Sequence, residues 1–180
     1  NKAEAEVKTE KKAKSEPRAD FVIPKESVDD AKMFLSEVLK KIGLEATLSV
    51  RLDGNTIHID VAGDKMGLLI GKRGDTLDAV QYLTSLYVNK ESETYIRVKI
   101  DTENYRERRK ETLETLAKNI AYKVKRTRKS VYLEPMNPYE RRIIHSALQN
   151  DKYVCTKSEG EEPYRKVVVM LKRGNHKKEA

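Results

Sequence analysis

The segment Ile70-Gly71-Lys72-Arg73-Gly74 constrains this chain most, because two glycines enclose two cations in a Gly-x-x-Gly pattern. Glycine permits tight turns and lets another backbone approach closely, since it has no Cβ. Residues 66–70 are apolar enough for one helical turn before the pattern. After it, a three- and four-residue repeat predicts a helix whose buried face carries Leu77, Val80, Leu83, Thr84 and Tyr87. The glycines are therefore predicted to form a tight loop between two helices.

The composition of this loop favours a nucleic-acid backbone as its ligand. Lys72 and Arg73 can pair with phosphates, and the next helix offers its N-terminal amides. A nucleotide-binding phosphate loop would need four residues between its first glycine and the Gly-Lys pair, followed by Ser or Thr. Only three residues separate Gly67 from Gly71, and Arg73 follows Lys72, so the pattern excludes that loop. A plain glycine turn without a ligand stays open from these four residues alone.

Further elements are predicted on both sides of the loop. Ser27 and Asp30 are typical of a capping box, and a helical stripe ended by Gly43 follows them: Ala31, Phe34, Leu35, Val38, Leu39 and Ile42. Residues 47–52 and 56–61 alternate around Asp53-Gly54-Asn55, which predicts a hairpin, and residues 95–100 alternate again. The predicted order is helix, strand, strand, helix, loop, helix, strand.

With this order, residues 25–101 resemble a KH domain of the prokaryotic topology, whose signature is Ile-Gly-x-x-Gly. The resemblance implies a KH RNA-binding domain over residues 23–102, with a three-stranded sheet backed by helices and a groove for about four single-stranded nucleotides. It also implies that Gly71, Lys72, Arg73 and Gly74 clamp the phosphates. Ile70, Leu77 and the edge of strand 56–61 would then form the floor of the groove.

A second motif lies downstream, in Asn137-Pro138-Tyr139-Glu140-Arg141-Arg142-Ile143-Ile144-His145. Asn137 can cap a helix, and Pro138 suits its first position. Arg141, His145 and Gln149 are predicted on one polar face of this helix, opposite a packed face of Ile143, Ile144, Ala147 and Leu148. Taken singly, His145 fits an ordinary solvated face.

Arg141, Arg142 and His145 together offer two cations and a ring, which suits single-stranded nucleic acid. The only acidic residue near His145 in this helix is Glu140, on a different side, which disfavours a catalytic base. The sequence therefore predicts a binding role for this motif.

The Arg-x-x-x-His helix is followed by an extended segment at 153–157, a turn at 158–163 and a β-rich run at 165–171. This part, predicted as one domain over residues 103–173, resembles the single-strand-binding domain named after that arginine and histidine. Its place behind a KH domain, with Leu133-Glu134-Pro135-Met136 between them, resembles the Jag, or SpoIIIJ-associated, family of bacterial RNA-binding proteins. The resemblance implies a cytoplasmic regulator of RNA that is linked to cell elongation, cell shape and envelope growth. It also implies a KH-only protein partner.

A long helix over about 103–126 is predicted to join the two modules, with a packed stripe of Leu113, Leu116, Ala117, Ile120, Ala121 and Val124. Its end is basic, because residues 115–133 contain no Asp or Glu. Cations near a helix C-terminus are favoured by the helix dipole, so ordinary capping stays open. Lys123, Arg126 and Arg128 are predicted to form a track for a nucleic-acid backbone.

The formal charge of +8 over 180 residues favours a polyanionic partner. No apolar run approaches the roughly twenty residues of a membrane-spanning helix, so no membrane insertion is expected. The single cysteine, Cys155, cannot form an internal disulfide, which suits a reducing cytoplasm. Residues 1–22 are predicted to be a disordered linker and residues 174–180 a loose tail. The missing initiator Met suggests a fragment of a longer protein, and the family resemblance implies a small N-terminal domain before the linker.

The fold class predicted is α+β, with two small modules joined by a long basic helix. The function predicted is single-stranded RNA binding without catalysis, cofactor or metal. Two alternatives stay open: an interaction adaptor that forms a homodimer or pairs with the KH-only partner, with RNA binding secondary, and an RNA phosphodiesterase that uses His145.

Overall fold

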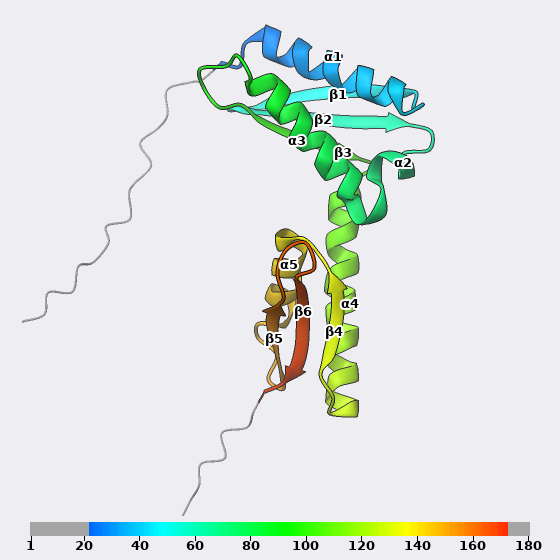
Figure 1. Ribbon diagram of the computed structural model, residues 1–180, viewed down its shortest axis with the longest axis vertical. Helices are drawn as coiled ribbons and strands as arrows, with labels where there is room; N and C mark the ends of the chain where they lie inside the picture. Colours follow the sequence, from blue (N-terminus) through cyan, green and yellow to red (C-terminus); the bar gives the residue numbers. More distant parts are fainter. Residues whose placement is uncertain (1–21, 173–180) are drawn as a thin grey trace, which may run out of the picture. The chain divides into compact units, whose positions relative to one another are not determined.

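The computed structural model describes residues 22–172, so the predicted linker and tail lie outside the described residues except for Val22. The fold is α+β, as predicted, and contains two three-stranded sheets (Figure 1). The chain divides into two compact units. Of the described residues, the first unit combines 22–64 with 78–100, and the second combines 65–77 with 101–172. The Gly-x-x-Gly loop therefore belongs to the second unit.

The first unit is built on the sheet β1-β2-β3, formed by β1 (Ala46–Asp53), β2 (Thr56–Gly63) and β3 (Arg97–Thr102). Asp53 pairs with Thr56, so the predicted hairpin closes through Gly54 and Asn55. Strand β2 is the central strand and not an edge of the sheet. Its alternate residues Ile57, Ile59 and Val61 are buried, which gives the sheet one apolar face.

Helix α1 (Lys25–Lys41) packs on this apolar face through Ala31, Leu35 and Leu39, as its stripe predicts. The predicted capping box is wrong. The helix already begins at Lys25 after Pro24, and Ser27 is buried inside the first turns without capping. Pro24 occupies the N-cap position, and no side chain caps the helix there. Gly43 ends the helix with φ +77°, and the Leu44 amide donates to the Leu39 carbonyl at 2.9 Å.

Helix α3 (Asp75–Asn89) follows the loop as predicted, but its buried stripe is turned from the predicted one. Leu83 and Tyr87 are 49% and 40% exposed, whereas Val88 is buried along with Val80 and Thr84. Gln81 accepts a hydrogen bond from the Ile100 amide of β3 at 3.0 Å. That bond requires the polar side chain on the inner side of the helix. Tyr87 instead stacks on Phe34 of α1, with ring centroids 4.8 Å apart.

The second unit contains the sheet β4-β6-β5, formed by β4 (Val131–Pro135), β5 (Val154–Glu159) and β6 (Lys166–Leu171). Both pairings are antiparallel, and β4 shifts register between Tyr132 and Pro135. Strand β4 was not predicted, because a run of cations precedes it and Pro135 ends it. Proline is tolerated there because β4 is an edge strand, where fewer ladder donors are needed.

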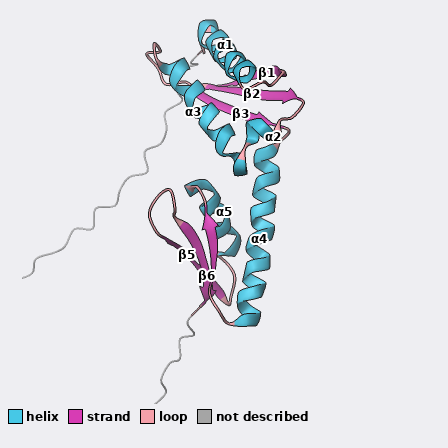
Figure 2. Cartoon of the chain, turned by 45° about the vertical axis from the view of Figure 1, so that its right-hand side comes forward, coloured by secondary structure: helices cyan, strands magenta, loops and turns pink. Residues whose placement is uncertain are grey.

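Helices α4 (Tyr105–Thr127) and α5 (Pro138–Leu148) both pack on one face of this sheet (Figure 2). The helices and alternate strand residues share one core: Leu113, Ala117, Ala121, Val124, Leu133, Met136, Ile144, Leu148, Val154, Val167 and Val169. The predicted stripe of the long helix is thus confirmed in its buried members, although Leu116 is 37% exposed. None of the described helices combines the length and apolarity needed to cross a bilayer.

Candidate nucleic-acid interface

The Gly-x-x-Gly loop connects α2 (Gly67–Ile70) to α3 through the tight turn η1 (Lys72–Gly74), as the sequence predicts. Gly71 and Gly74 have φ +68° and +88°, a region that other residues rarely adopt. A Cβ at Gly71 would overlap Thr76 Oγ1, and one at Gly74 would lie 2.8 Å from Tyr105 Cε1. Both glycines are therefore required by conformation and by space.

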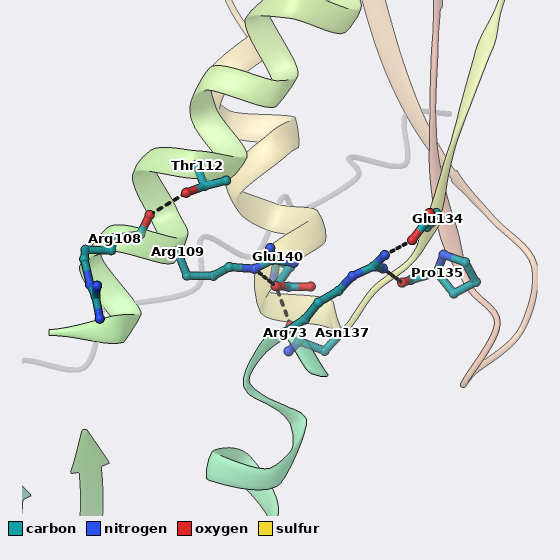
Figure 3. Close-up of polar contacts among 8 residues, drawn as sticks. All are labelled: Arg73, Arg108, Arg109, Thr112, Glu134, Pro135, Asn137 and Glu140. Atoms are coloured by element: carbon teal, nitrogen blue, oxygen red, sulfur yellow. Dashed lines mark hydrogen bonds and ion pairs between the residues drawn. The ribbon is translucent and has the colours of Figure 1, made fainter. Parts of the chain in front are cut away.

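The two cations of the loop have different surroundings. Lys72 is exposed, whereas Arg73 is half-buried and has a left-handed backbone with φ +59°. The Arg73 guanidinium forms an ion pair with Glu134 and donates to the Pro135 carbonyl at 3.4 Å (Figure 3). Loop geometry thus presents Lys72 to solvent and holds Arg73 against β4.

A cavity of about 700 Å³ lies beside these contacts, within the second unit. The loop, the end of β4, the start of α5 and the turn before β6 line it with Lys72, Arg73, Asp75, Glu134, Pro135, Met136, Asn137, Pro138, Glu140, Glu162, Pro163 and Tyr164. The lining mixes cations with carboxylates. This cavity brings the loop of the first motif next to the residues that open the second.

The residues expected to floor a groove are placed differently. Leu77 is fully buried and presents no surface to a ligand. Strand β2 is flanked on both sides by other strands, so it offers no free edge. Ile70 is half-buried at the end of α2, immediately before the loop. Of the two apolar residues expected in the floor, Ile70 therefore keeps access to solvent and Leu77 does not.

The start of α5 is built as the sequence predicts. Asn137 lies in extended backbone, and its side chain accepts a hydrogen bond from the Glu140 amide at 2.9 Å. Pro138 occupies the first helical position, where its missing amide donor costs nothing. These two residues set the direction in which the Arg-x-x-x-His motif leaves the cavity.

Arg141, predicted on the polar face of the helix, is buried. Only 8% of the residue is exposed. Its Nη1 donates to the Met136 carbonyl at 2.7 Å, and both terminal nitrogens donate to the Glu162 carboxylate, at 3.2 and 2.6 Å. A bidentate arginine pair of this kind fixes the geometry of both partners. Arg141 therefore ties α5 to the turn before β6.

Both ring nitrogens of His145 also have hydrogen-bond partners. Nδ1 lies 2.6 Å from Thr156 Oγ1, and Nε2 lies 2.9 Å from Ser158 Oγ, both on β5. Burial, and next the positive charge of Arg141, lower the pKa of His145 below its ordinary value of 6.5. The lowered pKa favours the neutral form of the ring, which lies between α5 and β5. Arg142, by contrast, is exposed.

Glu140, the acidic residue of the motif, is only 5% exposed and pairs with Arg109 of α4. Arg109 Nε donates to Glu140 Oε1 at 2.7 Å (Figure 3). Sequence reasoning missed this pair, along with Glu134, Glu162, Thr156 and Ser158. The alternation of the β5 segment could have indicated Thr156 and Ser158, which share one face of that strand, but the three carboxylate pairs join residues too distant in sequence for a local pattern.

The basic end of α4 carries the remaining predicted residues. Lys123, Arg126 and Arg128 are all exposed. Lys125 instead has partners within the protein. Its Nζ pairs with the Asp151 carboxylate at 2.6 Å and lies 5.3 Å from the Tyr153 ring centroid. Arg128 caps the helix with a left-handed backbone. The three predicted cations are thus free to meet solvent at one helix end.

Comparison with known proteins agrees with the two motifs. The family profile described as "KhpA/KhpB, KH domain" matches residues 32–100, and the profile of the domain named after the Arg-x-x-x-His motif matches residues 111–171. The RNA-binding protein KhpB of Clostridium symbiosum is 64% identical over 151 residues, which cover 83% of this chain and 68% of that protein.

Two further relatives with the same name are 40% identical. In Bacillus subtilis (strain 168) the match covers 81% of this chain and 71% of the relative, and in Lactiplantibacillus plantarum it covers 78% and 44%. Together with the order of the two domains, these identities confirm the resemblance stated from the motifs. The chain belongs to the KhpB, or Jag, family, with a KH domain followed by an Arg-x-x-x-His domain.

Proposed function

We propose that this chain binds single-stranded RNA, with the phosphate backbone held at the Gly-x-x-Gly loop and led along the cavity toward α5. The observation that carries the proposal is the loop itself. Two glycines force a tight turn at which Lys72 is exposed, and this turn opens on a cavity of about 700 Å³. A turn of this shape lets a nucleic-acid backbone approach closely, and its cations neutralise phosphates.

The Arg-x-x-x-His motif contributes by positioning the elements beside the cavity as well as by its charge. Arg141 and His145 were predicted as RNA contacts, and each would have to exchange an internal partner for a phosphate or base. We assign them first a positioning role, because they fix the turn at Glu162 and the strand β5 beside the cavity. Arg142 is exposed and needs no such exchange, so it is the phosphate contact that we propose from this helix.

Binding rather than catalysis is the activity proposed for the site. Both ring nitrogens of His145 are hydrogen-bonded to hydroxyls, and the carboxylate of Glu140 is paired with Arg109. A general base needs a nitrogen or oxygen that can reach the proton it removes. The name of the relatives, RNA-binding protein KhpB, supports the same activity for this chain. A cytoplasmic location and a link to cell elongation and envelope growth belong to this proposal, and rest on the family resemblance.

Fluorescence anisotropy of a labelled 16-nucleotide uridine RNA, titrated over a series of salt concentrations, tests the proposal. We expect Lys72→Asp with Arg73→Asp to weaken binding at least about tenfold, because each lost charged hydrogen bond is worth roughly 1.5–3 kcal/mol. Arg142→Ala should weaken binding less. Lys32→Asp with Lys40→Asp is the matched control, since both lysines are exposed on α1 and the net charge change is the same.

Thermal unfolding of each variant separates loss of contact from loss of fold. The proposal fails if wild-type protein shows no salt-dependent binding, or if the loop variant binds as tightly as the α1 control. Electrophoresis of the same samples after incubation with magnesium is expected to show intact RNA. A ladder of shorter products would instead favour the phosphodiesterase.

A second candidate function is an adaptor that pairs with another KH protein or with itself. The observation that favours it is an apolar surface on α3, where Tyr82, Leu83 and Leu86 are 63%, 49% and 52% exposed. Surfaces of this kind often mark protein interaction sites. The loop variant distinguishes the two functions. If it loses RNA binding and still pairs with its protein partner, RNA binding does not depend on the adaptor function.

A further inference from the structure

The sheet β4-β6-β5 has one face that the helices leave uncovered. Its inner face carries Leu133, Val154, Val167 and Val169, which pack in the core against α4 and α5. Side chains alternate across a sheet, so Tyr132, Lys157, Lys166, Val168 and Met170 project from the opposite face. Within the second unit, α4 and α5 both pack on the inner face and leave the opposite face free (Figure 2).

The register places these side chains next to one another. Tyr132 of β4 and Lys157 of β5 both pair with Val168 of the central strand, so the three form one row across the sheet. Met170 pairs with Cys155 in the neighbouring row. Val168 is only 1% exposed at the centre of this row, whereas Tyr132 is 59% exposed. Neighbouring side chains thus cover Val168, and the Tyr132 ring is the exposed aromatic surface of this row.

A lysine lies over that ring. Lys166 Nζ is 5.2 Å from the centroid of Tyr132, the geometry of a cation–π contact. The side chain of Lys157 is 66% exposed, and its charge is partly offset by Glu159 at 3.3 Å. An exposed ring that carries a lysine combines a surface for a base with a charge for the adjoining phosphate, which is the equipment of single-strand-binding sheets.

The position along the chain connects this face to the basic end of α4. Strand β4 begins three residues after Arg128, and Tyr132 lies four residues from it, about 13 Å in extended chain. An RNA strand that contacts the exposed cations Lys123, Arg126 and Arg128 would therefore reach Tyr132 directly. This continuity, the exposed Lys157 and the half-buried Lys166 favour a polyanion over an uncharged peptide.

We propose that the uncovered face of the sheet β4-β6-β5 is a further RNA-binding surface, on which Tyr132 stacks a base while Lys166 pairs with the neighbouring phosphate. The proposal rests on the RNA-binding function proposed above and adds a site outside both motifs. The occupant is single-stranded RNA with its bases turned toward the sheet.

The test compares Tyr132→Leu, Tyr132→Phe and Lys166→Gln with wild type, using the 16-nucleotide uridine RNA. We expect Tyr132→Leu to weaken binding at least about fivefold, because a stacked base contributes that much or more, and Tyr132→Phe to bind as wild type. Lys166→Gln should lower the slope of log affinity against log salt by about 0.7. The control is Tyr139→Leu, whose ring is 60% exposed on α5 in the same unit.

Two readouts identify stacking directly. An RNA of the same length without bases should bind wild type and Tyr132→Leu equally, since no base remains to stack. Photo-crosslinking with 4-thiouridine RNA should attach the label to the peptide that contains Tyr132, as mass spectrometry can show.

The outcomes separate this inference from the function on which it rests. If wild type binds no RNA, the proposed function fails and this inference with it. If the loop variant loses binding while Tyr132→Leu matches wild type and Tyr139→Leu, this surface alone is refuted. A change of oligomeric state in Tyr132→Leu at unchanged RNA affinity would also overturn it, in favour of a protein contact.

Discussion

Arg141 and His145 lie four residues apart on α5, and the polar atoms of both side chains bind to neighbouring segments of the second unit. Arg141 reaches the Met136 carbonyl and the Glu162 carboxylate, and His145 reaches two hydroxyls of β5. A buried donor without a partner costs about 1–3 kcal/mol, so these bonds stabilise the local fold. At this scale, the motif acts as a clamp on the strand and turn that flank the cavity.

We expect the charge state of His145 to make stability depend on pH. The folded pKa is lowered by burial and by Arg141, so the unfolded chain takes up this proton more readily than the folded one. Stability from this residue is complete above about pH 6.5, the ordinary value, and is lost as the pH falls through the folded pKa.

Urea unfolding of wild type and His145→Gln at pH 7.5, 6.5 and 5.5 measures the effect. The difference in unfolding free energy between the two proteins should shrink toward low pH, because glutamine cannot take up the proton. A difference that stays constant over this range would show that the pKa of His145 is the same in the folded and the unfolded chain.

At the scale of elements, the loop η1 and the edge strand β4 share an ion pair. Glu134 pairs with Arg73 of this turn. In the same turn, Thr76 and Tyr105 leave no room for a Cβ at the two glycines. The side chain of Arg73 is 33% exposed and that of Glu134 is 71% exposed, so water competes for the pair and its net energy is small. We therefore expect a phosphate of bound RNA to replace the Glu134 carboxylate at Arg73.

Replacing Glu134 should consequently raise RNA affinity. We expect Glu134→Gln to tighten binding roughly twofold to fivefold, because a competing carboxylate worth up to about 1 kcal/mol is removed. Glu91→Gln is the control, since Glu91 is an exposed carboxylate of the first unit that pairs with Lys90. Equal affinities of the two variants would show that Arg73 does not exchange Glu134 for a phosphate.

At the scale of the whole molecule, charge is distributed over several elements that one RNA strand could contact. The exposed cations Lys123, Arg126 and Arg128 lie at the end of α4, and Lys72 and Arg142 lie in the two motifs. Several weak contacts on one chain strengthen one another through effective concentration. Salt dependence is the property that reports how many of them a strand uses at once.

Neutralising the helix end should reduce this dependence. We expect Lys123→Gln with Arg126→Gln and Arg128→Gln to lower the salt slope by up to about 2, roughly 0.7 for each phosphate contact. The melting temperature should stay near that of wild type, because all three side chains are exposed.

Lys125→Gln provides a control on the same helix, at a lysine that already has a partner within the protein. This lysine pairs with Asp151 and contacts Tyr153, so its loss should lower the melting temperature and change the salt slope little. An unchanged slope in the triple variant would exclude the helix end from the RNA path.

The sequence by itself determined the features that depend on neighbours along the chain. The Gly-x-x-Gly loop between helices, the hairpin at Gly54 and Asn55, the capped start of α5 and the buried members of the α4 stripe are all placed as predicted. Each follows from periodicity, or from a backbone conformation that few residue types can adopt. The family followed from the order of two such motifs.

Only the tertiary structure decided which polar side chains meet a ligand and which meet the protein. Arg141 finds Glu162 across 21 residues, Arg109 finds Glu140 across 31, and Arg73 reaches Pro135 across 62. A helical pattern shows which face a residue occupies, but it does not show what another segment brings to that face. Burial and charge partners are properties of the packed chain, and for this reason the exposed members of the predicted RNA site could be told from the internal ones only after folding.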